Sequence, residues 1–254
     1  MQYAWCGRLV GGLLAIVISI VPVLAADGYS RERVRFRAAA EKTVFPSDAA
    51  QFQYEYESLN NTVRADGVLL WPVALPEDNP FIYVTEQEAV ELANNGTGVL
   101  FIGDGACRVC RMMATLLVDA VSDERAVGNP YVSRLYYLNP GLLDENGQAY
   151  RELAQSVLKP LGDYLQDYQE SYTNIYGTPV LIEQKAVIGN PSDAEEYKYT
   201  AAFYYEGLLL GVIVGTTSHF VDSNTPPTEA DKEEFCASFW KLAGLFGTDL
   251  CNYC

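Results

Sequence analysis

The chain has 254 residues, of which 49% are hydrophobic and 20% are charged, a composition typical of a globular protein and not of a disordered chain or a multispanning membrane protein. Its 33 acidic residues outnumber its 17 basic ones, and the formal net charge is -16. Because a nucleic-acid binder needs a basic face for the phosphates, this balance argues against nucleic acid as a partner.

The N-terminus has the three parts of a secretory signal peptide. Arg8 precedes the uncharged, mostly apolar run Leu9–Leu24, and Ala25 follows as a small residue suited to cleavage. Residues 1–25 are therefore predicted to be a signal peptide, and the mature protein to be secreted or associated with the cell envelope. An uncleaved anchor is the alternative, because the 18 residues of Leu9–Ala26 carry no charge.

Residues 26–78 are predicted to be an N-terminal extension with short strands that packs on the domain after it. Phe52–Tyr56 alternates with the period of a strand, and Val68–Val73 is an apolar run that contains Pro72. A basic cluster near its start is either a solvated segment or a contact for an anionic cell wall or lipid. Its members are Arg31, Arg33, Arg35 and Arg37.

From Asn79 onward, predicted strands and helices alternate. The predicted strands are Phe81–Val84, Val99–Ile102, Leu135–Leu138, one that begins at Thr178, and a hairpin of Ala201–Tyr205 and Leu208–Val214. The predicted helices follow Thr85, the Cys107–Cys110 motif and Thr228, and one with a break near Pro160 lies within residues 145–172. This order predicts an α/β fold, with a mixed sheet flanked by helices over residues 79–247 and a cysteine-containing tail at 248–254.

Cys107 and Cys110 are the candidate catalytic residues. Their Cys-x-x-Cys motif lies between a predicted buried strand and an amphipathic helix, where the partial positive charge of a helix N-terminus stabilises a thiolate. Arg108 and Arg111 add positive charge and are expected to favour the thiolate further. Cys110, one turn along, is placed to resolve a mixed disulfide on Cys107. An inert local disulfide is the alternative.

Residues 79–246 resemble the thioredoxin-like superfamily. The resemblance rests on Val99–Ile102, Cys107–Cys110, Thr178-Pro179 and the hairpin Phe203–Gly211 before the last helix. Within that superfamily the chain is similar to exported thiol–disulfide oxidoreductases of Gram-positive bacteria and to bacteriocin-transport accessory proteins.

The resemblance implies a role for each residue of the motif. It implies that Cys107 is the attacking thiol and Cys110 the resolving one, and that Pro179 is a cis-proline beside them. Thr178, Pro179, Arg108 and Val109 would contact a substrate peptide. The implied partners are protein thiols and disulfides and a redox partner protein, with no bound cofactor.

The chain departs from the family pattern at three places. Arg108-Val109 replaces the Gly-Pro of reducing thioredoxins, and the dipeptide tunes the redox potential. Phe101 occupies the position of a buried carboxylate that acts as a proton shuttle, and the nearest acid, Asp104, lies in a predicted turn. The helical region between Pro140 and Tyr176 is also expanded, and an insertion separates Pro179 from the hairpin.

Three further cysteines are candidates for a structural disulfide. Cys236 is expected to pair with Cys251 or Cys254, which closes a loop of about 15 residues and stabilises the fold by roughly 3 kcal/mol. A second redox pair at the tail and an intermolecular disulfide are alternatives. No metal site is expected, because the two Cys-x-x-Cys pairs are distant in sequence and His219 is the single histidine.

The sequence therefore predicts an exported thiol–disulfide oxidoreductase. The alternative function is a non-catalytic binding or accessory module that uses the same scaffold, with Cys107 and Cys110 as a structural clamp. A catalytic Cys107 is expected to be accessible, whereas a clamp is expected to be buried and hard to reduce.

Overall fold

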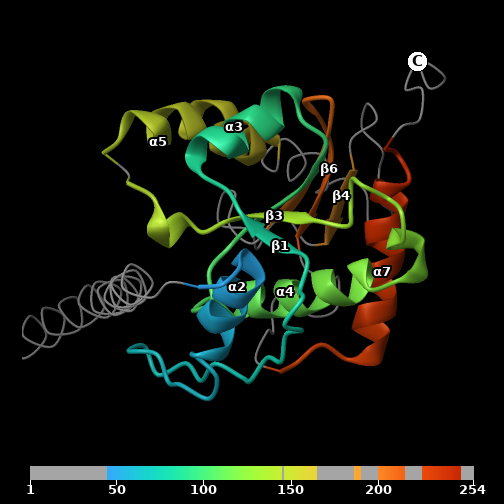
Figure 1. Ribbon diagram of the computed structural model, residues 1–254. Coiled ribbons are helices and arrows are strands. Elements are labelled where there is room, and N and C mark those ends of the chain that lie inside the picture. Colours follow the sequence, from blue (N-terminus) through green and yellow to red (C-terminus); the bar gives the residue numbers. More distant parts are fainter. Residues whose placement is uncertain (1–44, 145, 165–185, 190–199, 215–224, 247–254) are drawn as a thin grey trace, which may run out of the picture.

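The structure is a computed structural model that describes residues 45–144, 146–164, 186–189, 200–214 and 225–246 (Figure 1). It contains one mixed sheet with the strand order β1-β3-β2-β5-β6-β4. The strands are β1 (Phe81–Tyr83), β2 (Gly98–Ile102), β3 (Leu135–Leu138), β4 (Ala186–Gly189), β5 (Thr200–Tyr205) and β6 (Leu208–Val214). β3 is parallel to β1 and β2, β5 is antiparallel to β2 and β6, and β4 is parallel to β6.

Helices cover both faces of this sheet, so the predicted α/β fold is confirmed (Figure 1). One face carries α2 (Asp48–Glu57), α4 (Arg108–Val121) and α7 (Glu229–Ala243). The other face carries α3 (Glu86–Asn95), α5 (Gln148–Leu153) and the π-helical turn Ala154–Leu158. Two short 3-10 helices, Glu124–Ala126 and Pro140–Leu142, follow α4 and β3.

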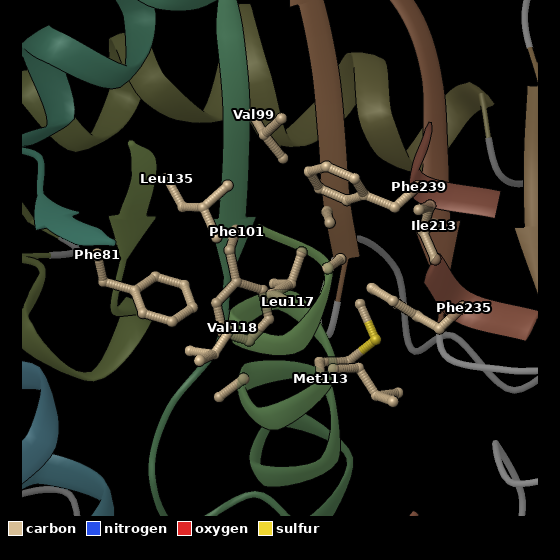
Figure 2. Packing of buried hydrophobic residues seen from close by; sticks show 14 of the residues in the cluster. Phe81, Val99, Phe101, Met113, Leu117, Val118, Leu135, Ile213, Phe235 and Phe239 are labelled. Atoms are coloured by element: carbon tan, nitrogen blue, oxygen red, sulfur yellow. The ribbon is translucent and has the colours of Figure 1, made fainter. Parts of the chain in front are cut away.

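Strand β2 divides the hydrophobic core into two halves. All five of its residues are buried, as expected for a strand covered on both faces. Val99 and Phe101 belong to the half that packs against α4 and α7, shown in Figure 2. Leu100 and Ile102 belong to the half beneath α3 and α5. This alternation follows from the two-residue period of a strand.

Several local signals produce the elements that the sequence predicts. Thr85 caps α3 and Thr228 caps α7, each in a capping box with the acidic residue three positions later. Glu206 and Gly207 join β5 to β6, and both have positive φ values, as a tight hairpin turn requires. Gly207 also approaches the backbone of Asn94 so closely that no side chain would fit there.

The strand prediction for Phe52–Tyr56 is wrong, because these residues lie in α2. Ser47 caps the helix by accepting a hydrogen bond from the backbone of Ala50. Aromatic residues at 52, 54 and 56 fit a strand, but Phe52 and Tyr56 are also four residues apart and so share one helical face. Both are fully buried, whereas Tyr54 is exposed. The one strand-like pairing within residues 45–78 is the isolated bridge of Val63 with Leu69.

Helix α7 ends at Ala243, with Gly244 as its C-cap. The predicted break near Pro160 is an interruption and not an end: α5 stops at Leu153, and α-helix resumes through residues 159–164. The π-helical turn Ala154–Leu158 comes directly before it. Proline has no N–H and its ring clashes with the carbonyl four residues earlier, and the wider turn accommodates both effects.

Other sequence predictions lie outside the described residues. They are the signal peptide 1–25, the arginine cluster at 31–37, Thr178, Pro179, His219 and the tail 248–254 with Cys251 and Cys254. Within the part of the chain that is described, no helix has both the length and the apolar character to cross a membrane.

Candidate functional site

The Cys107–Cys110 motif lies between a strand and a helix, where the sequence places it. β2 ends at Ile102, a turn follows, and Cys107 is the N-cap of α4. The Cys107 sulfur accepts a hydrogen bond from the backbone N–H of Cys110 at 3.2 Å. Among the described cysteines no disulfide forms, and both of these thiols are free. The pair is therefore a dithiol at the positive end of a 14-residue helix.

Both sulfurs are buried beneath the surface. Cys107 is 5% exposed and Cys110 is fully buried, whereas Arg108 and Val109 between them are half-buried. Burial raises the pKa of Cys110, and the neighbouring Cys107 raises it further. A Cβ at Gly103 would lie 2.9 Å from the Cys110 sulfur, so only glycine fits there. Cys110 is therefore a protonated thiol at neutral pH, packed against the end of β2.

A buried carboxyl group, Glu55 of α2, lies beside the turn that precedes the motif. Its Oε1 accepts hydrogen bonds from Tyr137 Oη at 2.5 Å, Asn139 Nδ2 at 2.7 Å and the Gly105 N–H at 3.0 Å. Its Oε2 accepts one from Tyr83 Oη at 2.5 Å. Burial raises the pKa of Glu55 from 4.5 to about 7, against the lowering effect of these donors. Glu55 can therefore exchange a proton near neutral pH.

Tyr137 links Glu55 to the surroundings of Cys110. Its hydroxyl lies 2.8 Å from the Gly103 carbonyl and 3.5 Å from the Tyr56 hydroxyl. The Gly103 carbonyl can only accept, and Tyr137 has one proton to donate. When Glu55 is protonated on Oε1 it can donate to Tyr137, which then donates to Gly103. When Glu55 is ionised, Glu55 and Gly103 compete for the same proton. The network therefore accommodates both protonation states of Glu55.

Arg111 is fully buried directly after the motif, and all five of its N–H groups are used. Nε and Nη2 donate to the Trp71 carbonyl at 3.1 and 2.9 Å, and Nη2 also donates to Asn60 Oδ1 at 2.5 Å. Nη1 donates to the carbonyls of Tyr56 at 2.7 Å and Gly105 at 3.0 Å. Arg111 therefore ties residues 56–71 to the start of α4.

Side chains of residues 45–78 help to hold the turn before Cys107. Gly105 donates to Glu55 and accepts from Arg111, and the Ala106 carbonyl accepts from Arg64 Nη1 at 3.1 Å. Asp104, itself buried, accepts from the Ala106 N–H at 2.9 Å. The segment 45–78 is thus part of the site and not only an extension packed on the domain.

Sequence reasoning missed Glu55 because a strand at 52–56 places residue 55 on the opposite face from the aromatic residues. A helical interpretation would have placed Glu55 next to Tyr56 at the edge of the buried face. Phe101 was a second signal. It occupies the position where a proton-shuttling carboxylate was expected, so such a carboxylate would have to come from another element.

Cys236 of α7 lies apart from the motif. It is half-buried, its sulfur is 3.5 Å from Arg125 Nη2 and 3.9 Å from Asp123 Oδ2, and its thiol is free. Its predicted partners Cys251 and Cys254 lie outside the described residues. In the described ranges no three His, Cys, Asp or Glu residues gather in a way that would hold a metal ion.

Comparisons of the chain with protein-family models, with curated proteins and with solved structures find no match. The function is therefore inferred from the geometry around Cys107 and Cys110.

Proposed function

We propose that the protein is an exported thiol–disulfide oxidoreductase with a thioredoxin-like fold that exchanges disulfides with protein cysteines. The observation that carries the proposal is the free dithiol of Cys107 and Cys110 at the N-terminus of α4. A helix N-terminus favours a thiolate, and the two-residue spacing lets the second sulfur reach the first. The mixed sheet with helices on both faces is compatible with the proposed fold.

Exchange needs two displacements at sulfur. The Cys107 thiolate attacks a substrate disulfide, forms a mixed disulfide, and releases one substrate sulfur as a thiolate. Cys110 then loses its proton and attacks the Cys107 sulfur. The Cys107–Cys110 disulfide forms and the second substrate sulfur leaves as a thiolate. Two electrons pass to the substrate, and the reverse sequence oxidises a substrate dithiol.

Glu55 is the proposed acceptor for the Cys110 proton. Burial keeps Cys110 protonated, so the second displacement requires a base inside the protein. Glu55 has a pKa of about 7 and lies in a hydrogen-bonded network with Tyr137, whose hydroxyl contacts the Gly103 carbonyl next to Cys110. A group with a pKa near the working pH is suited to accepting and returning a proton.

The second candidate function is the non-catalytic accessory module, and the burial of Cys107 favours it. With 5% of its surface exposed, Cys107 is less accessible than expected for an attacking thiol. In this case Cys107 and Cys110 would form a structural clamp at the start of α4.

A redox titration of the mature chain separates the two functions. The thiols are trapped by alkylation at each potential, and each cysteine is mapped by mass spectrometry. An oxidoreductase is expected to exchange Cys107–Cys110 reversibly at roughly -120 to -270 mV, whereas a clamp resists reduction to below about -300 mV. Cys107→Ser should abolish exchange and Cys236→Ser should preserve it. Full exchange activity in Cys107→Ser would rule out the oxidoreductase.

A further inference from the structure

Arg111 carries a buried positive charge that is satisfied by neutral groups. Its acceptors are the carbonyls of Trp71, Tyr56 and Gly105 and the side-chain oxygen of Asn60, so none of them is a carboxylate. Burial lowers the pKa of Arg111 to about 10, which leaves the guanidinium charged at neutral pH. A buried charge is costly unless an opposite charge lies close by.

Cys107 is the group near Arg111 whose charge changes during thiol–disulfide exchange. The backbone N–H of Arg111 donates to the Cys107 carbonyl at 3.0 Å, and the guanidinium interacts electrostatically with Tyr56 and Cys107. Burial raises the pKa of Tyr56, so this neighbour stays neutral at pH 7. Two acidic side chains also contact the turn that Arg111 contacts: Glu55 accepts from the Gly105 N–H, and Asp104 accepts from the Ala106 N–H. A thiolate at Cys107 adds a counter-charge that a disulfide removes.

We propose that Arg111 is a positioning residue that couples the charge on Cys107 to the packing of residues 56–71. Three of its four acceptor residues, Tyr56, Asn60 and Trp71, lie at the ends of this segment or within it. With a thiolate at Cys107 the guanidinium is stabilised and holds the segment tightly. With a disulfide the guanidinium loses the counter-charge on Cys107 and the segment is held less tightly. The inference rests on the proposed function only for the origin of the change in charge.

Cys107→Asp and Cys107→Asn test the coupling without any redox chemistry. Asp and Asn are equally good N-caps, so both variants keep the start of α4 and differ by one negative charge. The readout is the rate of hydrogen exchange at two backbone amides, measured on the full chain at pH 7. Leu70 lies within residues 56–71, and Val73 follows them closely. The Leu70 N–H donates to the Thr62 carbonyl, and the Val73 N–H donates to Asn60 Oδ1, which also accepts from Arg111. We expect exchange at both amides to be at least threefold slower in Cys107→Asp.

Substitutions of Arg111 separate this coupling from the effect of a charge on the helix itself. The difference in exchange rate between the Asp and Asn variants should persist when Arg111→Lys is added and vanish when Arg111→Gln is added. The proposal is overturned if the rate difference remains in Arg111→Gln, or if it is confined to the amides of α4. If Arg111→Gln does not fold, Asn60→Ala is used in its place. If the Asp and Asn variants differ in their exchange rate at Leu70 by the same factor with and without Asn60→Ala, the proposal is also overturned.

The wild-type protein gives an independent measurement. Residues 56–71 should exchange more slowly in the reduced protein than in the oxidised one, and equal rates contradict the coupling. A failed redox titration would reject the oxidoreductase but leave the comparison of Cys107→Asp with Cys107→Asn intact. The two proposals therefore fail separately.

Discussion

Glu55 and Arg111 form hydrogen bonds with the backbone N–H and the carbonyl of Gly105, respectively. The Gly105 N–H donates to Glu55 Oε1 at 3.0 Å, and its carbonyl accepts from Arg111 Nη1 at 3.0 Å. One side chain comes from α2 and the other from α4, so two buried charged residues from separate helices fix the turn that leads into Cys107. The position of the dithiol thus depends on the packing of residues 45–78.

Gly105→Ala should destabilise the protein. A Cβ at this position would lie 2.6 Å from the Glu55 carbonyl oxygen, which is backbone and cannot rotate away. We expect a loss of about 1–3 kcal/mol in the free energy of unfolding, the range for overpacked sites. Gly162→Ala is the matched control, because nothing lies within 4 Å of its Cβ and the residue is helical. It should stabilise by about 0.5–1 kcal/mol. Urea unfolding measures both, and equal effects would contradict the close packing of Gly105.

Glu55→Gln should change how stability depends on pH. The folded protein holds the Glu55 proton up to about pH 7, whereas the unfolded chain releases it near pH 4.5. The folded state therefore binds more protons in this interval, and the wild type loses stability as the pH rises through it. The loss is on the order of 3 kcal/mol relative to a side chain that does not titrate. The free energy of unfolding of Glu55→Gln should therefore rise relative to that of the wild type between pH 5 and 8.

The control for this pH series is Glu88→Gln. Hydrogen bonds from Thr85 lower the pKa of Glu88, so its contribution to stability is lost only below about pH 5. The stability of this variant relative to the wild type should stay constant between pH 5.5 and 8. Urea unfolding at a series of pH values gives both curves, and parallel curves for wild type and Glu55→Gln would show that Glu55 does not titrate there.

Glu55→Gln should also slow the second step of thiol–disulfide exchange. Without a base for its proton, Cys110 attacks the mixed disulfide roughly 100-fold more slowly. Acid quenching followed by mass spectrometry should then show substrate accumulating on Cys107. Glu88→Gln should leave the rate unchanged, and Cys110→Ser should trap the mixed disulfide completely. Unchanged turnover in Glu55→Gln would remove Glu55 from the proposed mechanism.

Phe52→Ala should destabilise the whole domain. The Phe52 ring stacks on Phe81 of β1 with a centroid distance of 3.8 Å, and it meets Tyr137 edge-on at 4.7 Å. Loss of a fully buried aromatic side chain costs about 3–5 kcal/mol. Tyr54→Ala, on the exposed side of α2, should cost less than about 1.5 kcal/mol. Thermal unfolding should show one shifted transition, whereas a separate early transition would mean that residues 45–78 unfold independently.

Local sequence signals were sufficient for most elements of the fold. The capping boxes at Thr85 and Thr228, the apolar run Val99–Ile102 and the turn at Glu206-Gly207 each depend on neighbours within a few residues. The same holds for the placement of Cys107 and Cys110 between a strand and a helix. Each of these signals acts through the backbone geometry of its own segment, so the sequence by itself determined the layered α/β architecture and the location of the dithiol.

Only the tertiary structure decided the surroundings of that dithiol. Glu55 meets Tyr137 and Asn139 across 82 and 84 residues of sequence, and Arg111 meets Trp71 and Tyr56 across 40 and 55. Contacts at such separations leave no periodic trace in a single sequence. The spacing of Phe52 and Tyr56 fits both a strand and a helix, and burial against β1 and β3 selected the helix. That selection placed Glu55 in the core, where burial raised its pKa towards neutrality.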